Sequence, residues 1–174
     1  QFTISVGLIV STLIIYKQLK LVQNKNLGFD KENVLIIDNV NTLDNNKQLF
    51  VEALRDMDHV VDASISDYIP PHIYSNSVYF PNGDREQTTS FFTIYADQNY
   101  QETLGLSMYS GRYFSPEFPS DSSAVLINKT GMEIIGWESH EGNYIEMPSN
   151  DGNQEIFNVV GIFDDFNFAS LHSE

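Results

Sequence analysis

The first sixteen residues carry no charged side chain. The run reads QFTISVGLIVSTLIIY, and its aliphatic residues would surround the whole circumference of a helix instead of forming one stripe. A helix that is apolar all round lies either in a protein core or in lipid. This run constrains the chain more than any other feature, because such an N-terminal helix must be buried or must enter a membrane.

The membrane interpretation is favoured over a buried core helix or strand. A spanning helix needs about 20 residues, and the chain begins inside the run with no initiator Met and no basic segment before it. We therefore expect the numbering to start partway through a membrane helix. A signal peptide fits poorly, because no small-residue cleavage site follows Ile15. Lys17, Lys20 and Lys25 follow the run, and basic flanks usually stay inside, but long domains are exported largely regardless of charge.

Charge is distributed unevenly along the chain. The formal net charge is −15, and no acidic residue precedes Asp30, so residues 26–174 carry a net charge of −18. Such a surface repels phosphate backbones, which excludes nucleic-acid binding, and it should hold the body away from anionic lipid headgroups. The sequence has no cysteine, which excludes disulfides and thiolate metal sites.

The first part of the body predicts a strand–helix–strand unit. Residues 34–37 are four consecutive aliphatic residues and predict a strand. Asp44 is expected to cap a helix over about residues 45–58, which carries a one-sided apolar stripe. Residues 61–65 alternate as a second strand. The two prolines at 70–71 close the unit.

The following part predicts shorter strands and turns. Residues 78–80 and 91–96 should pair as a hairpin, because the Pro-Asn-Gly-Asp sequence at 81–84 is a strong turn signature. Further predicted elements are a helical turn at 100–104, a loop at 111–114, a strand at 124–127, a helix from the Asn128 cap to Gly136, a turn at 151–153 and a strand at 156–163. The fold class is α+β: a strand–helix–strand (α/β sandwich) lobe with an inserted β-rich lobe, preceded by a transmembrane or stalk helix.

No catalytic, cofactor-binding or metal-binding residues are predicted. The sequence lacks phosphate-binding glycine loops and a nucleophile elbow. Its four histidines are far apart, and the Asn150–Asn153 stretch lacks calcium-loop spacing. Asp164 and Asp165 follow a strand, where binding sites often lie, but a solvated capping turn is the favoured interpretation. Asn128 begins a glycosylation sequon, yet a helix cap is favoured. The chain is therefore expected not to be an enzyme.

Three stretches, taken in order, resemble one family. They are residues 18–35, which include Asn26-Leu27-Gly28-Phe29-Asp30; residues 100–106 with Gly111-Arg112-Tyr113-Phe114-Ser115; and residues 125–129 with 159–168 and Ser170-Leu171. Their order and spacing are similar to the periplasmic core domain of MacB/FtsX-like ABC transporter permeases, in the form common in Bacteroidetes. The resemblance covers almost the whole chain.

The resemblance implies a domain organisation and a set of partners. Residues 1–27 would be the end of transmembrane helix 1 and the stalk, 28–71 the first part of a membrane-proximal α/β lobe, 72–155 the inserted β-rich lobe, and 156–174 the return to the first lobe. The implied partners are a cytoplasmic ABC ATPase subunit, a second permease copy and a periplasmic adaptor or outer-membrane partner. The implied location is the bacterial inner membrane, with this domain in the periplasm.

The implied function is to couple cytoplasmic ATP hydrolysis to export or to periplasmic partners. A stiff helix from about residue 2 to residue 26, ended by Gly28, would act as a lever joined to the body. Two alternatives remain open: a ligand-sensing extracytoplasmic domain of a receptor kinase, which should present one defined pocket, and a soluble hydrolase, which should present a polar cluster in a cleft.

Overall fold

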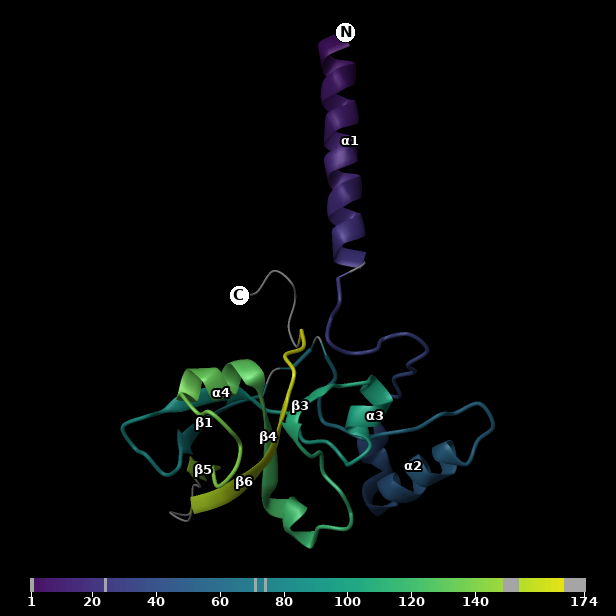
Figure 1. Cartoon of the computed structure of the whole chain (residues 1–174). Helices are drawn as coiled ribbons and strands as arrows, with labels where there is room; N and C mark the ends of the chain where they lie inside the picture. The colour runs from purple at the N-terminus through teal and green to yellow at the C-terminus, as the bar shows by residue number, and fades with distance from the viewer. Residues whose placement is uncertain (1, 24, 71, 74, 149–153, 168–174) are drawn as a thin grey trace.

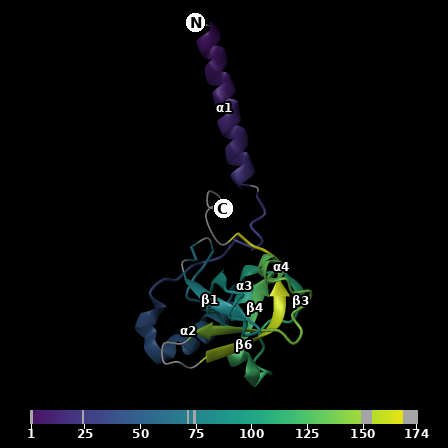
Figure 2. The same ribbon diagram turned by 90° about the vertical axis from the view of Figure 1, so that its left-hand side faces the viewer.

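A long N-terminal helix stands apart from a mixed helix-and-strand body. The computed structural model describes residues 2–23, 25–70, 72–73, 75–148 and 154–167. Helix α1 spans Phe2–Gln23 and projects away from the body in both views (Figures 1 and 2). In the described part of the chain, α1 is the one helix that is long and apolar enough to cross a membrane, judged by length and composition. None of its described side chains is buried.

Helix α1 ends earlier than the predicted lever. The described helix stops at Gln23, and residues 25–27 have no regular structure, so the prediction of a continuous helix to residue 26 is wrong. The side chain of Asn26 accepts a hydrogen bond of 2.9 Å from the backbone N–H of Gly28. Asparagine side chains compete in this way with helical hydrogen bonding, which favours a turn over another helical turn.

The segments flanking helix α2 differ from the predicted strand–helix–strand unit. Helix α2 spans Lys47–Arg55 and follows the 3-10 helix η1 (Val40–Asn46), so Asp44 lies inside η1 and does not cap α2. Neither 34–37 nor 61–65 forms a strand; the nearest pairing is an isolated bridge between Ser66 and Ala96. A strand requires a partner for its backbone groups, and no described segment pairs with 34–37, where Leu35 is 82% exposed.

A six-stranded sheet forms the centre of the body. Its strands are β1 (Asn76–Pro81), β2 (Thr89–Phe92), β3 (Met108–Gly111), β4 (Ala124–Asn128), β5 (Tyr144–Pro148) and β6 (Gln154–Phe163). The order is β2-β1-β5-β6-β3, and β4 pairs in parallel with β6 while the other pairs are antiparallel. The predicted hairpin is confirmed as β1–β2, whereas β3 was not predicted and overlaps the predicted loop at 111–114 only at Gly111. The predicted turn at 151–153 lies outside the described residues.

Helix α4 (Lys129–Ile135) packs on this sheet as the sequence predicts. Asn128 caps it by accepting from the N–H of Gly131 at 3.2 Å, and Gly136 ends it in the left-handed conformation with φ of 84°. The helix and the sheet together form a core of five buried residues: Ile127, Met132, Ile135, Val159 and Ile162. Both ends of α4 are thus set by local residue chemistry, and its middle is set by burial.

A second core forms around the short helix α3 (Tyr100–Leu104). Its buried members are Tyr100, Leu104 and Leu106, and Phe29, Val34 and Phe166 are among the half-buried residues packed against them. This cluster therefore joins the segment after α1, the middle of the chain and the segment after β6. Helices and strands alternate irregularly within one body, and the predicted α+β class with a preceding helix is confirmed.

Candidate functional site at the base of the N-terminal helix

The segment that leaves α1 enters the body at Gly28. Here φ is 80°, a left-handed conformation that glycine adopts without strain. A Cβ at this position would lie 2.8 Å from the Asp165 carbonyl oxygen and 2.8 Å from the Phe166 Cα. These are backbone atoms, which cannot move aside as a flexible side chain could. Gly28 therefore permits a close approach between two backbone segments; the prediction that it ends the helix is wrong, because α1 already ends at Gln23.

The segment after β6 is hydrogen-bonded to the segment after α1. The backbone N–H of Asn167 donates to the Leu27 carbonyl at 2.7 Å. The side-chain amide of Asn167 lies 3.3 Å from the same carbonyl and 3.4 Å from the Asn26 carbonyl. One asparagine thus contacts the entering segment through backbone and side chain together.

Helix α3 holds the entering segment from a second direction. The backbone N–H of Asp30 donates to the carbonyl of Leu104, the last residue of α3, at 2.7 Å. The Asp30 carboxylate accepts from the N–H of Glu32 at 2.9 Å, which fixes the turn that follows. Gly105 ends α3 in the left-handed conformation with φ of 62°.

Aromatic packing fills the space between these contacts. Phe29 and Phe166 meet edge to face with centroids 6.4 Å apart, and Phe163 lies 5.5 Å from Phe166. Such pairs add about 0.5–1.5 kcal/mol beyond burial. We call residues 26–30, Leu104 and 165–167 the junction. If residues 26–30 move, they must either carry α3 and the segment after β6 with them or break these contacts.

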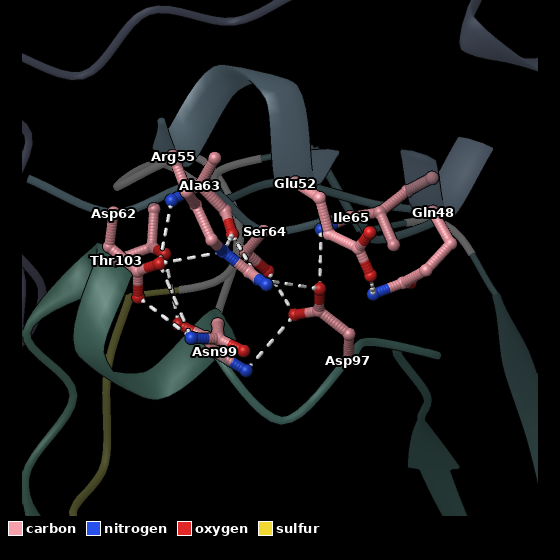
Figure 3. Close-up of polar contacts among 10 residues, drawn as sticks. All are labelled: Gln48, Glu52, Arg55, Asp62, Ala63, Ser64, Ile65, Asp97, Asn99 and Thr103. Atoms are coloured by element: carbon pink, nitrogen blue, oxygen red, sulfur yellow. Dashed lines mark hydrogen bonds and ion pairs between the residues drawn. The ribbon is translucent and has the colours of Figure 1, made fainter. Parts of the chain in front are cut away.

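A polar cluster fastens α2 to the loop before α3 (Figure 3). The Arg55 guanidinium lies 3.0 Å from an Asp62 carboxylate oxygen, 2.9 Å from the Ala63 carbonyl and 3.5 Å from Asp97. Asp97 also accepts from the Ser64 hydroxyl at 2.6 Å, and Asn99 donates to Asp62 at 3.1 Å. The arginine side chain is 23% exposed and the two carboxylates less. Each of the three charged side chains in the cluster has a partner of opposite charge, which offsets the cost of burying it. The cluster therefore has a structural role.

The two acidic residues after β6 have structural roles. Asp165 accepts from the Thr130 N–H at 3.1 Å, from the Thr130 hydroxyl at 2.8 Å and from the Asn128 amide. It therefore supports the start of α4, which precedes it in sequence, and not a following element as the capping interpretation expected. The Asp164 N–H donates to the Ser107 carbonyl at 2.9 Å. Across the described residues, no group of three His, Asp or Glu side chains could hold a metal ion.

A cavity of about 920 Å³ lies beside the junction. Phe91, Tyr95, Tyr100, Tyr113, Phe163 and Phe166 are among its lining residues. Burial raises the pKa of both Tyr100 and Tyr113 well above the usual range, so their hydroxyls stay neutral at physiological pH. Asp121 also lines the cavity, but it is paired with Arg112 at 2.6 Å. Asp97 is a second acidic residue of the lining, and it is paired with Arg55 at 3.5 Å. The lining is therefore mostly apolar and aromatic, with neutral hydroxyl donors and two carboxylates that are already paired.

Comparison with solved structures identifies the fold. A domain from a candidate permease protein of Porphyromonas gingivalis aligns with a TM-score of 0.50 at 15% identity, over 67% of this chain and 45% of that chain. The chain shares the fold of that domain. The periplasmic region of MacB from Actinobacillus actinomycetemcomitans also aligns, with a TM-score of 0.47 at 15% identity, over 68% of this chain and 50% of that one.

This likeness of fold is recognised through structure alone. No family model and no curated protein matches the sequence. The chain spans about half the length of the solved structures, or less. The sequence had indicated Gly28 but not the contacts of Asn167 and Leu104. Each of the three stretches that carry the resemblance contains one of these residues: Gly28 the first, Leu104 the second and Asn167 the third. The junction therefore brings the three stretches together.

Proposed function

We propose that this chain is the extracytoplasmic domain of an ABC transporter permease, and that the junction passes motion of α1 into the body. One observation carries the proposal: the segment leaving α1 is held from two sides, by Asn167 to Leu27 and by Asp30 to Leu104, at 2.7 Å each. Each hydrogen bond makes a net contribution of only about 1 kcal/mol to stability. Acting together with the aromatic packing, the two bonds hold the residues of the junction as one unit.

The lever in this proposal is shorter than a continuous helix would be. Because α1 ends at Gln23, force reaches the body through residues 25–30 and their backbone contacts. The divisions at 1–27, 28–71, 72–155 and 156–174 belong to the same proposal. So do the partners: a cytoplasmic ATPase subunit, a second permease copy and a periplasmic adaptor or outer-membrane partner. The domain itself is proposed to be non-catalytic.

Location is tested by cysteine labelling. These 174 residues contain no cysteine, so a single Glu86→Cys change introduces one reactive thiol at an exposed position. In whole cells whose outer membrane is permeable to the reagent, a maleimide that cannot cross the inner membrane should label it. Labelling only after lysis would place the body in the cytoplasm and refute the proposal.

Coupling is tested in the full-length protein purified with its ATPase subunit. The proposal predicts ATP hydrolysis in the complex that depends on an intact junction. A full-length protein with three further membrane helices and an associated ATPase supports the permease; a signalling module behind the membrane segment refutes it.

The cavity supports a second candidate function, the ligand-sensing domain of a membrane receptor kinase. Ligand sites commonly measure about 300–1,000 Å³ and are mostly apolar with a few polar groups, and the cavity fits that description. The sensor hypothesis predicts a ligand whose binding changes kinase output, whereas the permease hypothesis predicts that disrupting the junction changes ATP-driven activity.

A further inference from the structure

Three lysines converge at the foot of α1. A hollow of about 320 Å³ is lined by Lys17, Lys20, Leu21 and Lys25. Lys17 and Lys20 are three residues apart and share one face of the helix. The chain beyond the helix end then brings Lys25 to the same hollow. No acidic side chain lines it, and the ion pairs found among the described residues involve none of these lysines.

This arrangement calls for a negative ligand. Like charges around one hollow repel each other, and an anion placed between them removes that repulsion. The negative end of the helix dipole accounts for Lys20 in the last turn. It does not account for Lys25, which lies beyond the helix. The acidic residue nearest in sequence is Asp30, but its carboxylate accepts from the Glu32 N–H and does not line the hollow.

The depth of the hollow in a membrane identifies the class of anion. The uncharged run ends at Tyr16, and Lys17 is the first charged residue. Tyrosine is enriched at the membrane–water interface, and lysine extends its ammonium group toward the headgroups there. With the upper part of α1 in the hydrocarbon, the lysines therefore lie at the level of the lipid phosphates.

We propose that this hollow binds the phosphate of an anionic phospholipid on the outer face of the membrane. This inference depends on the membrane placement in the proposed function. The lipid would hold the base of α1 at a fixed depth. It would also neutralise the lysines beside a body whose net charge is −18 over residues 26–174. The acidic body itself repels such lipids, so attraction is confined to the foot of the helix.

The test measures lipid selectivity at the protein surface. The full-length protein, which supplies the rest of the membrane helix, is reconstituted in bilayers of equal parts phosphatidylcholine and phosphatidylglycerol, and spin-labelled versions of each lipid report which one is immobilised against the protein. One lysine near a membrane surface contributes about 1 kcal/mol, so we expect about fivefold or greater preference for phosphatidylglycerol. The triple change Lys17→Gln, Lys20→Gln and Lys25→Gln should remove it.

A matched control uses the other three lysines of the chain. The changes Lys31→Gln, Lys47→Gln and Lys129→Gln alter net charge equally and should leave the preference intact. Equal loss in both triple variants would mean a general charge effect and would overturn the site. Loss of the preference in excess inorganic phosphate would assign the hollow to free phosphate and overturn the lipid assignment. Insertion of the full-length protein into the mixed bilayer without lipid selectivity refutes this inference alone, whereas failure of the full-length protein to insert refutes the membrane placement as well.

Discussion

Replacing Gly28 with alanine should damage the junction selectively. Alanine in a left-handed conformation costs about 1 kcal/mol in any context. At Gly28 the new Cβ would also meet the backbone of Asp165 and Phe166 at 2.8 Å. The segment 165–167 must then move, which removes the Asn167–Leu27 hydrogen bond and the Phe29–Phe166 contact, at about 1 kcal/mol each. We expect Gly28→Ala to lower the free energy of unfolding by about 3 kcal/mol.

Gly136→Ala is the matched control. Its φ of 84° is close to the 80° of Gly28, but a Cβ there meets no atom within 4 Å. We therefore expect a loss of only about 1 kcal/mol. Urea unfolding of the whole chain in detergent micelles measures both values. Equal losses in the two variants would show that the close approach at Gly28 contributes nothing.

Hydrogen exchange locates the damage. In Gly28→Ala the Asn167 amide should exchange faster, because its acceptor at Leu27 is displaced. The Val159 amide, which donates to the Asn143 carbonyl at 3.0 Å within the body, should keep its protection. Uniform loss of protection at both amides would indicate global unfolding and would contradict the local account.

Two further changes test the fastenings within the body. Arg55→Met should cost about 2 kcal/mol in urea unfolding, because it leaves two half-buried carboxylates without their cation; an unchanged midpoint would show that the cluster does not hold α2. The side-chain hydrogen bond from Arg112 holds the pKa of Asp121 below its usual range. This pair therefore stabilises the fold at pH values above the ordinary carboxyl pKa of about 3.9. The stabilisation is lost as the pH falls through the lowered pKa of Asp121. Asp121→Asn should therefore flatten the loss of stability below about pH 4, and parallel stability–pH curves for the two proteins would refute that.

The elements that could be predicted from the sequence are those whose ends are set by residues close to them in the chain. Asn128 and Gly136 set the two ends of α4 by local hydrogen bonding and backbone freedom, so both were predictable. The hairpin of β1 and β2 follows from its turn residues in the same way. Residues 34–37 and 61–65 have strand composition but no strand, because strand formation depends on a partner elsewhere in the chain.

The junction was predictable only in part. The sequence marks Gly28 as a residue that tolerates the left-handed conformation, although α1 ends before it at Gln23. Its role in the junction depends on Asp165 and Phe166, and the Asn167–Leu27 contact joins residues 140 positions apart. Pattern analysis of single segments contains no information on such a contact. The ordered resemblance had selected all three stretches, although it did not indicate that they meet.

The most direct test of the central claim is a distance measurement across the junction in the full-length protein together with the proposed ATPase subunit. One spin label replaces Val22 near the end of α1, and the other replaces the exposed Glu102 on α3. The account predicts one narrow distance distribution that is the same with and without ATP, because α1 and the body move as a unit, and a broadened distribution in Gly28→Ala. A broad distribution in the unaltered protein, or a distance that changes with nucleotide, would show that the body moves independently of α1 and would contradict the account.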